Sequence, residues 1–537
     1  MIRTGRSIVV ASVAALAALA GCTSGGGGTF QSSPLGEASP SGSAGPGGSS
    51  PAPAPGGSPA TPSTSPISFD DCTSVIRPQI KDQPGGDRDL RFGCGRLQVP
   101  LDYTDVAGRS IDLFLLRVRY GHREQPLGSL VVNPGGPGGS GLDAAVGLGL
   151  QLPLEVLGRF DIVGFDPRGV GLSHGIECIP AALKDRGLAL DPDARTAAQY
   201  AAQVALAKQT AEGCARKYGP SLAHYNTEET ARDMDLVRQA VGDQKLTYLG
   251  YSYGTRLGSV YASIFPDRVR AMVLDGAVNP LADEVASAES QAAGFENAYS
   301  QFAADCRRRG HGCRIGPDAR AFLAALIAKA RRAPIHSSRA GERRVATAGH
   351  VLLAALSALY DQKQWSDLAS ALAEANDGDA AGVFALADEY SQRDPHGDYT
   401  NILDANVAIN CADSALKVSD AMVRRLLSDW RTKYPLFGTS LALGLLGCQQ
   451  WQAPRHPLPR VRAAGAPPIL VIGTVHDPAT PYASARVLAR QLATGALLTW
   501  NGEGHTAYPK TNCVKQAVDA YLVTVRVPRA GTSCPSR

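Results

Sequence analysis

The chain has 537 residues, of which 44% are hydrophobic and 19% charged, and its formal net charge is +4. This length and balance allow more than one large globular core. So small a charge on so long a chain gives no reason to expect nucleic acid or an acidic membrane surface as a partner.

Residues 1–22 have the pattern of an export signal. Arg3 and Arg6 precede an apolar run at 8–20, and Gly-Cys follows it. A basic start, a short apolar stretch and small residues at the cut are typical of a secretory signal, and the run is too short for a membrane span. The letters LAGC resemble a bacterial lipobox, which predicts cleavage before Cys22 and a lipid on its thiol. An ordinary signal peptide that contains Cys22 by chance is the alternative.

Residues 23–66 consist almost entirely of Gly, Ser, Pro, Thr and Ala. Such a segment buries too little apolar surface to offset its ordering entropy, which predicts a disordered tether. With a lipid on Cys22, the tether predicts a protein that lies outside the cytoplasm and is held at the cell membrane by this anchor alone. Release of the folded part from the membrane stays open.

Ten cysteines remain after Cys22. An even number in an exported chain indicates a set of disulfides. Pairing between sequence neighbours is the simplest scheme, because each bond then closes a short or moderate loop. The expected pairs are Cys72–Cys94, Cys178–Cys214, Cys306–Cys313, Cys411–Cys448 and Cys513–Cys534. No CxxC pair and no HExxH occur in the sequence, so we expect no metal site.

From about residue 94 the sequence alternates between strand patterns and helix patterns. In the helix expected at 227–242, Thr227 is the candidate N-cap and Gly242 ends the helix. This βαβα alternation predicts an α/β fold with a mostly parallel sheet and helices on both faces. Strands are expected at 111–120, 128–133, 160–166, 245–250 and 269–276, and a second helix at 253–265.

The alternation stops after residue 280. Residues 281–460 are rich in Ala, Leu and charged residues at helical spacing, as in 318–332 and 350–360. The sequence therefore predicts one α/β domain, formed by residues 67–280 and 461–537, with a helical insertion at 281–460 that is placed to cap the strand ends. In the last part, strands are expected at 467–474 and 496–502 and a helix at 513–525.

Ser252 lies in the sequence GYSYG, between an expected strand and an expected helix. A nucleophile at such a corner needs small neighbours because the backbone is tight there, and Gly250 and Gly254 supply the room. The helix N-terminus brings backbone N–H groups and positive dipole close to the serine oxygen. This context predicts that Ser252 is the nucleophile of a serine hydrolase.

A serine hydroxyl needs a base, and in this architecture an acid and then a histidine follow the serine along the chain. Asp477 and His505 end successive strands. We expect His505 to take the serine proton and Asp477 to orient and stabilise the imidazolium. Two competitors stay open: His476 as the base and Asp275, which also ends a strand, as the acid.

The glycine-rich segment NPGGPGGSG at 133–141 follows a strand and precedes a helix. It exposes backbone N–H groups with no side chains in the way, which predicts an oxyanion hole with the N–H groups of Gly136 and Tyr253 as donors. A glycine turn that merely connects two elements is the alternative. A phosphate-binding loop is excluded because no Gly-Lys-Ser/Thr follows.

Together, NPGGPGGSG, GFDPRGVGLS, YLGYSYGTRLG, HDPATP and GEGH resemble the secreted tripeptidyl aminopeptidases of actinobacteria, which belong to the α/β-hydrolase superfamily and are similar to proline iminopeptidases. The resemblance covers about residues 70–537. It implies an α/β-hydrolase fold with a helical cap and the triad Ser252, Asp477 and His505, whose mechanism requires no metal or organic cofactor. Pro134 stands where proline iminopeptidases have a histidine, but the donor glycine after it is kept.

The resemblance implies an exported serine exopeptidase that cleaves peptide or protein substrates near a free N-terminus. A buried carboxylate is the physical way to bind a substrate ammonium. Asp413 is the candidate, and capping of a helix is its alternative role. Thr480 is expected to border the site, and Trp451 either lines the cleft or is an ordinary buried aromatic. An esterase or lipase with the same triad and a non-catalytic binding lipoprotein remain as alternatives.

Overall fold

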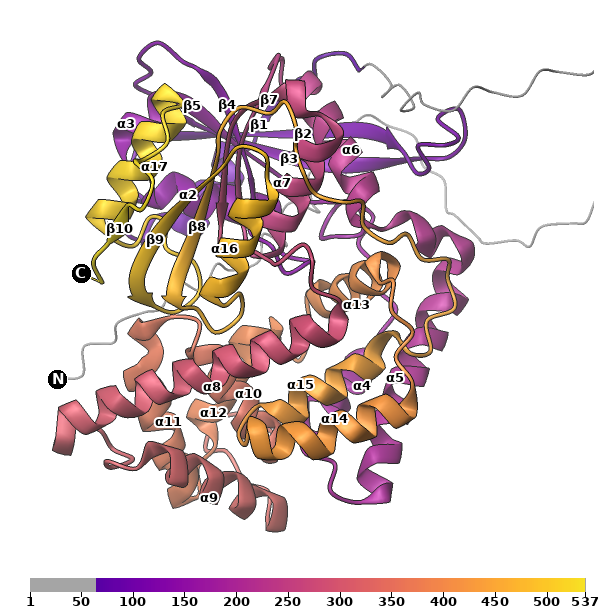
Figure 1. Cartoon of the computed structure of the whole chain (residues 1–537), viewed down its shortest axis with the longest axis vertical. Helices are drawn as coiled ribbons and strands as arrows, with labels where there is room; N and C mark the ends of the chain where they lie inside the picture. The colour runs from indigo at the N-terminus through magenta and orange to yellow at the C-terminus, as the bar shows by residue number, and fades with distance from the viewer. Residues whose placement is uncertain (1–63, 537) are drawn as a thin grey trace, which may run out of the picture.

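The computed structural model describes residues 64–536, in which a sheet domain lies next to a lobe of helices (Figure 1). The expected leader 1–22, the lipidation site Cys22 and nearly all of the tether 23–66 lie outside the described residues. Among residues 64–536, no helix is both long enough and apolar enough to span a membrane.

The sheet has ten strands within the described residues, in the order β1-β2-β3-β5-β4-β6-β7-β8-β9-β10. Strands from β5 through to β10 pair in parallel, whereas β1, β2, β3 and β5 pair antiparallel at one side. All seven strands expected from the sequence are present. The strands are β1 (Asp70–Asp71), β2 (Leu90–Pro100), β3 (Ser110–Tyr120), β4 (Gly128–Asn133), β5 (Phe160–Phe165), β6 (Leu246–Tyr251), β7 (Val269–Asp275), β8 (Ile469–His476), β9 (Gly495–Glu503) and β10 (Ser533–Cys534).

Helices cover both faces of this sheet. One face packs against α6 (Thr227–Ala240), α7 (Tyr253–Ile264) and α16 (Tyr482–Gln491). The opposite face packs against α1 (Thr73–Ile80), α2 (Gly141–Gln151), α3 (Leu154–Leu157) and α17 (Asn512–Thr524). The parallel sheet, the exchanged positions of β4 and β5, and the helical insertion between β7 and β8 make this an α/β-hydrolase fold, which confirms the expected fold class.

The N-terminus of α6 differs in detail from the prediction. Thr227 is the first helical residue, and Asn226 before it is the N-cap, whose side chain accepts a hydrogen bond from the N–H of Glu229. Asn is at least as good an N-cap as Thr, so the cap lies one residue earlier than expected. Thr227 is thereby left with a side chain that is available for a tertiary contact.

The helical lobe has its own core, separate from the two cores of the sheet domain. Phe295, Phe302, Leu323, Leu372 and Phe384 are among its buried residues. A lobe with an independent core can keep its shape while it covers the strand ends. Its helices are α8 (Glu284–Arg309), α9 (Ala319–Arg332), α10 (Ala348–Ala358), α11 (Trp365–Asp377), α12 (Ala381–Ser391), α13 (Ile402–Asp413), α14 (Asp420–Lys433) and α15 (Gly438–Gly444).

Two helices from the first part of the chain join this lobe. They are α4 (Ala181–Leu188) and α5 (Ala197–Tyr218), which run beside α14 and α15 in Figure 1. Tyr200 of α5 shares a buried cluster with Trp430 of α14. The sequence placed all of 67–280 with the sheet, because helical periodicity shows that α5 has an apolar stripe but not which surface covers it.

The five disulfides join the expected neighbours, which confirms the simplest pairing scheme. The bonds are Cys72–Cys94, Cys178–Cys214, Cys306–Cys313, Cys411–Cys448 and Cys513–Cys534. Each closes a loop of at most 37 residues in sequence separation. They fix loops within each lobe of the protein.

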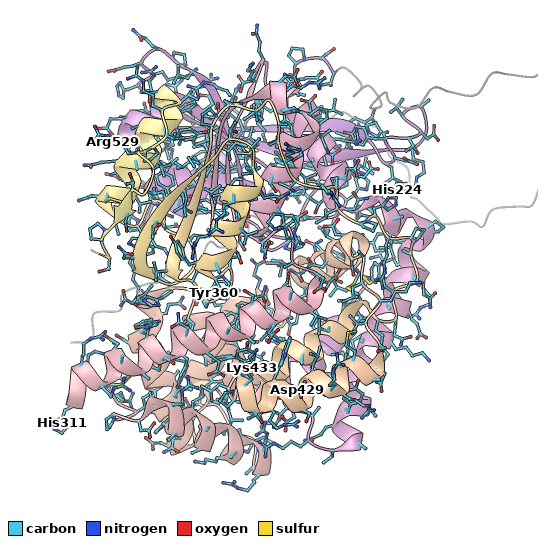
Figure 2. The ribbon with its side chains drawn as sticks, in the orientation of Figure 1. His224, His311, Tyr360, Asp429, Lys433 and Arg529 are labelled. Carbon is cyan, nitrogen blue, oxygen red and sulfur yellow. A yellow bond between two sulfur atoms is a disulfide. The ribbon has the colours of Figure 1, made fainter. Side chains whose placement is uncertain are left out.

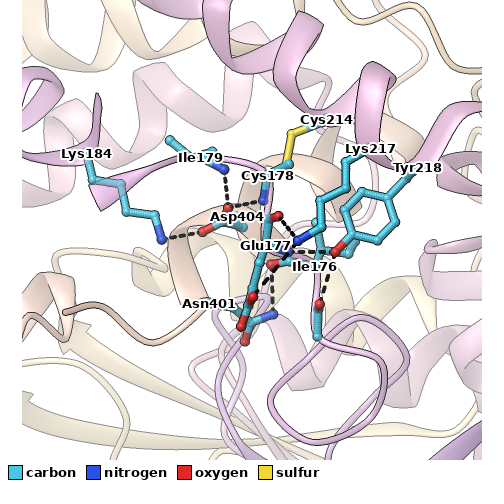
Figure 3. The surroundings of a disulfide bond; sticks show 11 residues. Ile176, Glu177, Cys178, Ile179, Lys184, Cys214, Lys217, Tyr218, Asn401 and Asp404 are labelled. Atoms are coloured by element: carbon cyan, nitrogen blue, oxygen red, sulfur yellow. Dashed lines mark hydrogen bonds and ion pairs between the residues drawn. A yellow bond between two sulfur atoms is a disulfide. The ribbon is translucent and has the colours of Figure 1, made fainter. Parts of the chain in front are cut away.

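Helix α13 is docked onto the loop that carries one of these disulfides (Figure 3). The carboxylate of Asp404 accepts hydrogen bonds from the backbone N–H groups of Cys178 and Ile179, both at 2.7 Å. Its second oxygen lies 2.6 Å from the ammonium of Lys184, and both side chains are buried. A buried carboxylate needs such partners, so these contacts hold α13 in one position against the segment fixed by Cys178–Cys214.

Candidate active site

Ser252 occupies the turn between β6 and α7. Its φ of 53° and ψ of −121° lie in a region that non-glycine residues rarely adopt and that is found at functional sites. The turn is also crowded, since a Cβ on Gly250 would come within 2.4 Å of the carbonyl oxygen of Gly254. A Cβ on Gly135 would lie 2.9 Å from the Cβ of Ser252. The glycines therefore let three backbone segments meet at this serine.

Asp477 and His505 come together at the ends of β8 and β9. The Nδ1 of His505 lies 2.9 Å from both carboxylate oxygens of Asp477, whose side chain is buried. Because a carboxylate only accepts, Nδ1 carries the proton and Nε2 carries the lone pair of the neutral ring. This Nε2 is buried and has no hydrogen-bond partner among residues 64–536. It is therefore free to accept a proton.

The imidazole ring of His505 lies next to the serine turn. The backbone N–H of Ser252 donates to the carbonyl oxygen of Asp275 at 2.9 Å, and Gly276 follows. A Cβ on Gly276 would lie 3.0 Å from Cε1 of His505. Gly276 therefore makes the room that the ring needs beside Ser252.

The competing residues have other partners. Asp275 accepts hydrogen bonds from the backbone N–H groups of Ala507 and Tyr508, and burial raises the pKa of its carboxyl to about 6. It supports the loop after His505 without a hydrogen bond to the ring. The Nδ1 of His476 lies 3.0 Å from the side-chain amide of Asn297. The geometry favours the pair of Asp477 and His505 over both competitors.

Thr480 borders this pair as well as the cavity in front of it. Its hydroxyl donates to Oδ2 of Asp477 at 3.0 Å and lies 3.3 Å from Nδ1 of His505. The backbone N–H groups of Ala479 and Thr480 donate to the other oxygen of Asp477 at 2.9 and 2.8 Å. These donors hold the carboxylate in one orientation, and with it the histidine ring.

A cavity of about 290 Å³ opens in front of Ser252. Gly136 and Tyr253, the two expected oxyanion donors, both line it together with Ser252 and Thr480. Within the described part of the chain, neither backbone N–H has a hydrogen-bond acceptor. Two free N–H groups beside a serine are what a developing oxyanion requires.

Among the segments of the helical lobe that touch the catalytic loops, two carry contacts that the sequence did not predict. The first is Tyr360, which lies between the lobe and the sheet domain in Figure 2. Its carbonyl oxygen accepts a hydrogen bond from the N–H of His505 at 2.8 Å, and its ring meets the imidazole edge-on with centroids 5.3 Å apart. A Cβ on Gly504 would lie 2.6 Å from the same carbonyl oxygen, so only glycine fits this approach.

The second segment is α13, which lies against the glycine-rich loop. The side-chain amide of Asn406 donates to the carbonyl oxygen of Pro137 at 3.1 Å, and Asn410 donates to Asn406 at 3.0 Å. A Cβ on Gly138 would come within 2.7 Å of the carbonyl oxygen of Ile402. In the sequence, the spacing of four between Asn406 and Asn410 puts them on one helix face, but nothing indicates that this face meets the loop.

Asn406 is therefore expected to act as a positioning residue for the oxyanion donors. Replacing it in N406A removes the donor to Pro137 and leaves the loop less well fixed. Since small misplacements of catalytic groups can cost about 100-fold, we expect kcat to fall roughly 10- to 100-fold with KM changed by less than about threefold. Steady-state kinetics on a peptide substrate measures both constants.

The matched control is N376A, which removes an exposed asparagine from α11 in the same lobe. It should leave both constants close to those of the wild type. A fall in thermal stability for N406A with kcat retained would contradict the positioning role, because it would make Asn406 a purely structural residue.

Asp413 and Trp451 do not line the cavity. The carboxylate of Asp413 accepts from both the backbone N–H, at 2.9 Å, and the hydroxyl of Thr227 at the N-terminus of α6. Burial raises its pKa to about 6. The hydroxyl of Thr227 lies 2.6 Å from that of Tyr253, so Asp413 lies behind the cavity wall. Trp451 is buried in the core and borders a separate surface cleft.

The chain is similar to several known hydrolases. The family model described as TAP-like protein matches residues 434–534. The serine protease Hip1 of Mycobacterium tuberculosis is 40% identical over 486 residues, which are 87% of this chain and 91% of that protein. Carboxylesterase B of M. tuberculosis is 35% identical, covering 82% of this chain and 86% of that one. Tripeptidyl aminopeptidase of Streptomyces lividans is 33% identical, covering 82% and 83%.

These identities extend over most of both chains. This protein therefore belongs to the TAP-like family of α/β-hydrolases, and it is a serine hydrolase of the peptidase type.

Proposed function

We propose that this protein is an exported serine exopeptidase that removes short peptides from a free N-terminus through an acyl-enzyme on Ser252. The observation that carries this proposal is the pair of Asp477 and His505, whose free Nε2 lies beside the strained serine turn. A serine in such a turn, with a base and an orienting acid next to it, has the parts required for acyl transfer.

In the proposed reaction, Oγ of Ser252 attacks the scissile carbonyl while Nε2 of His505 takes its proton. The negative charge on the tetrahedral oxygen is stabilised by the N–H groups of Gly136 and Tyr253. His505 then gives the proton to the leaving amine as the C–N bond breaks. Water, activated by the same nitrogen, hydrolyses the ester and restores Ser252. Asp477 stabilises the imidazolium in both halves of the reaction.

The lobe of helices supports the choice of an exopeptidase. It contributes Tyr360, Asn406 and Asn410 to the lining of the cavity, which at about 290 Å³ is at the small end of ligand pockets. Such a covered space suits the end of a short peptide better than the middle of a folded chain. The tripeptidyl aminopeptidase relative supports the same choice. Asp413 is bound to Thr227, so its contribution to an ammonium site is limited to electrostatic attraction.

We also propose that the protein lies outside the cytoplasm and is held to the membrane by a lipid on Cys22. The leader pattern and the LAGC sequence support this location, as does the tether that follows. Five disulfides support an oxidising compartment, because such bonds are rare in the reducing cytosol.

An esterase is the second candidate, because carboxylesterase B is 35% identical and the same triad cleaves esters. The test is mass spectrometry of the products from one peptide offered in two forms, with a free and an N-acetylated N-terminus. Loss of short N-terminal fragments from the free form alone is the expected result. Cleavage of both forms would make the enzyme an endopeptidase. Cleavage of neither form, by protein whose serine still reacts with a phosphonate, would favour the esterase.

A further inference from the structure

Arg256 lies in the wall of the catalytic cavity. It follows Ser252, the N-cap of α7, by four residues, so its backbone lies one turn or about 6 Å further along the helix axis, and both residues line the cavity. Its side chain is half-buried. Arg256 takes no part in the proposed acyl-transfer steps.

Its guanidinium is left without a protein partner. Two other arginines of the sheet domain are paired, Arg168 with Asp233 at 2.7 Å and Arg268 with Asp235 at 2.5 Å. Arg256 forms no ion pair and no side-chain hydrogen bond within residues 64–536. A half-buried arginine without a protein acceptor keeps its five N–H donors for water or for a ligand that enters the cavity.

The rest of the cavity wall is neutral. Apart from Arg256 it consists of glycine, apolar, hydroxyl and amide residues, among them Gln291, Asn410 and Tyr390, and none of its residues is a carboxylate. Asp413 lies behind the wall, where the charge of Arg256 reaches it, but the hydrogen bonds of its carboxylate are made to Thr227. The cavity therefore presents one cation and no anion to a substrate.

We propose that Arg256 forms a subsite for a carboxylate of the substrate, close to the bond that Ser252 attacks. This inference rests on the proposed peptidase function and adds a substrate class to it. A guanidinium fork binds a carboxylate through two parallel hydrogen bonds, which neutral amide or hydroxyl groups cannot replace. An extended peptide advances about 3.3–3.6 Å per residue, so a carboxylate at Arg256 lies within about two residues of the scissile bond.

Two sources can supply this carboxylate, the side chain of Asp or Glu and the C-terminus of a short peptide. The test therefore uses matched peptides that carry Glu or Gln at each of the two positions on either side of the cleaved bond. The same peptides are also compared with a free or an amidated C-terminus. The variants are R256M, R256K and, as a matched control, R486M, which removes an exposed arginine on α16 outside the cavity.

For the wild type we expect kcat/KM to be about 10- to 100-fold higher with the carboxylate at one of these places than with its neutral counterpart. In R256M the preference, which is kcat/KM for the carboxylate peptide divided by kcat/KM for its neutral counterpart, should fall to about 1. In R256K this ratio should lie between the values of the wild type and R256M, because Lys keeps the charge but not the fork. R486M should keep the wild-type ratio. The position that shows the effect identifies the source of the carboxylate.

Two results would overturn the inference while leaving the peptidase function intact: a wild-type ratio near 1 at every place, or a ratio that persists in R256M. If no peptide is cleaved, the peptidase proposal fails, and the subsite is tested on esters. Mono-4-nitrophenyl glutarate and 4-nitrophenyl pentanoate differ only in a carboxylate that replaces a terminal methyl group. The subsite predicts faster hydrolysis of the glutarate, lost in R256M, and equal rates for the two esters would overturn it.

Discussion

The S252A variant is expected to lose peptide hydrolysis almost completely, with kcat reduced roughly 10⁴- to 10⁶-fold. The serine turn, the free Nε2 of His505 and the two unused N–H groups all converge on this hydroxyl. Alanine keeps the backbone of the turn but removes the nucleophile, so substrate binding should survive while acyl transfer stops. Initial rates of peptide cleavage at saturating substrate measure the loss.

The control for this variant is S366A, which removes an exposed hydroxyl in the helical lobe. It should retain the wild-type rate. A residual rate of more than about one hundredth of the wild type for S252A would contradict the assignment of Ser252 as nucleophile, provided that contaminating hydrolases are absent.

The D477N variant is expected to lower kcat about 10³- to 10⁴-fold without disturbing the fold. An amide in place of the carboxylate can keep the hydrogen bonds from the N–H groups of Ala479 and Thr480 through its oxygen. Its nitrogen then faces Nδ1 of His505 as a donor. The ring is driven to the tautomer with a proton on Nε2, which cannot accept the proton of Ser252. The kcat of purified D477N and its thermal midpoint together test this expectation.

The matched comparison is D275N, which alters the competing acid. Asp275 binds the backbone N–H groups of Ala507 and Tyr508 rather than the imidazole, so its replacement should loosen the loop and lower kcat by about tenfold at most. A larger loss in D275N than in D477N would reverse the assignment and make Asp275 the acid of the triad.

Much of the fold could be predicted from the sequence because it follows local patterns. The apolar, β-branched stretches predicted strands β3 to β9. The glycines at 250 and 254 indicated a tight turn at Ser252. The strands that were missed, β1, β2 and β10, lie on the two sides of the sheet. Two of them have only two residues each, too few for a periodic pattern, and they form because distant segments meet them.

The residues of the candidate site also include some that the sequence predicts and some that it does not. Ser252, Asp477 and His505 could be chosen because each follows a recognisable strand and their order along the chain is informative. Tyr360, Asn406 and Arg256 could not, for two reasons. The first two act from the helical lobe, where Tyr360 lies 145 residues from His505 and Asn406 lies 269 residues from Pro137, and sequence periodicity does not show how two lobes dock. Nothing in the sequence distinguishes Arg256 from other helix residues, because its lack of an ion-pair or hydrogen-bond partner depends on the fold.

The central claim is that Ser252 forms a covalent intermediate, and the most direct test is the mass of the protein after reaction with a diphenyl phosphonate peptide. Such a reagent reacts with a serine only where a base and an oxyanion hole activate it. We expect one adduct per chain in the wild type, mapped to Ser252 by digestion, and none in S252A or D477N within the same time. An adduct on another residue, or equal labelling of S252A, would contradict the claim.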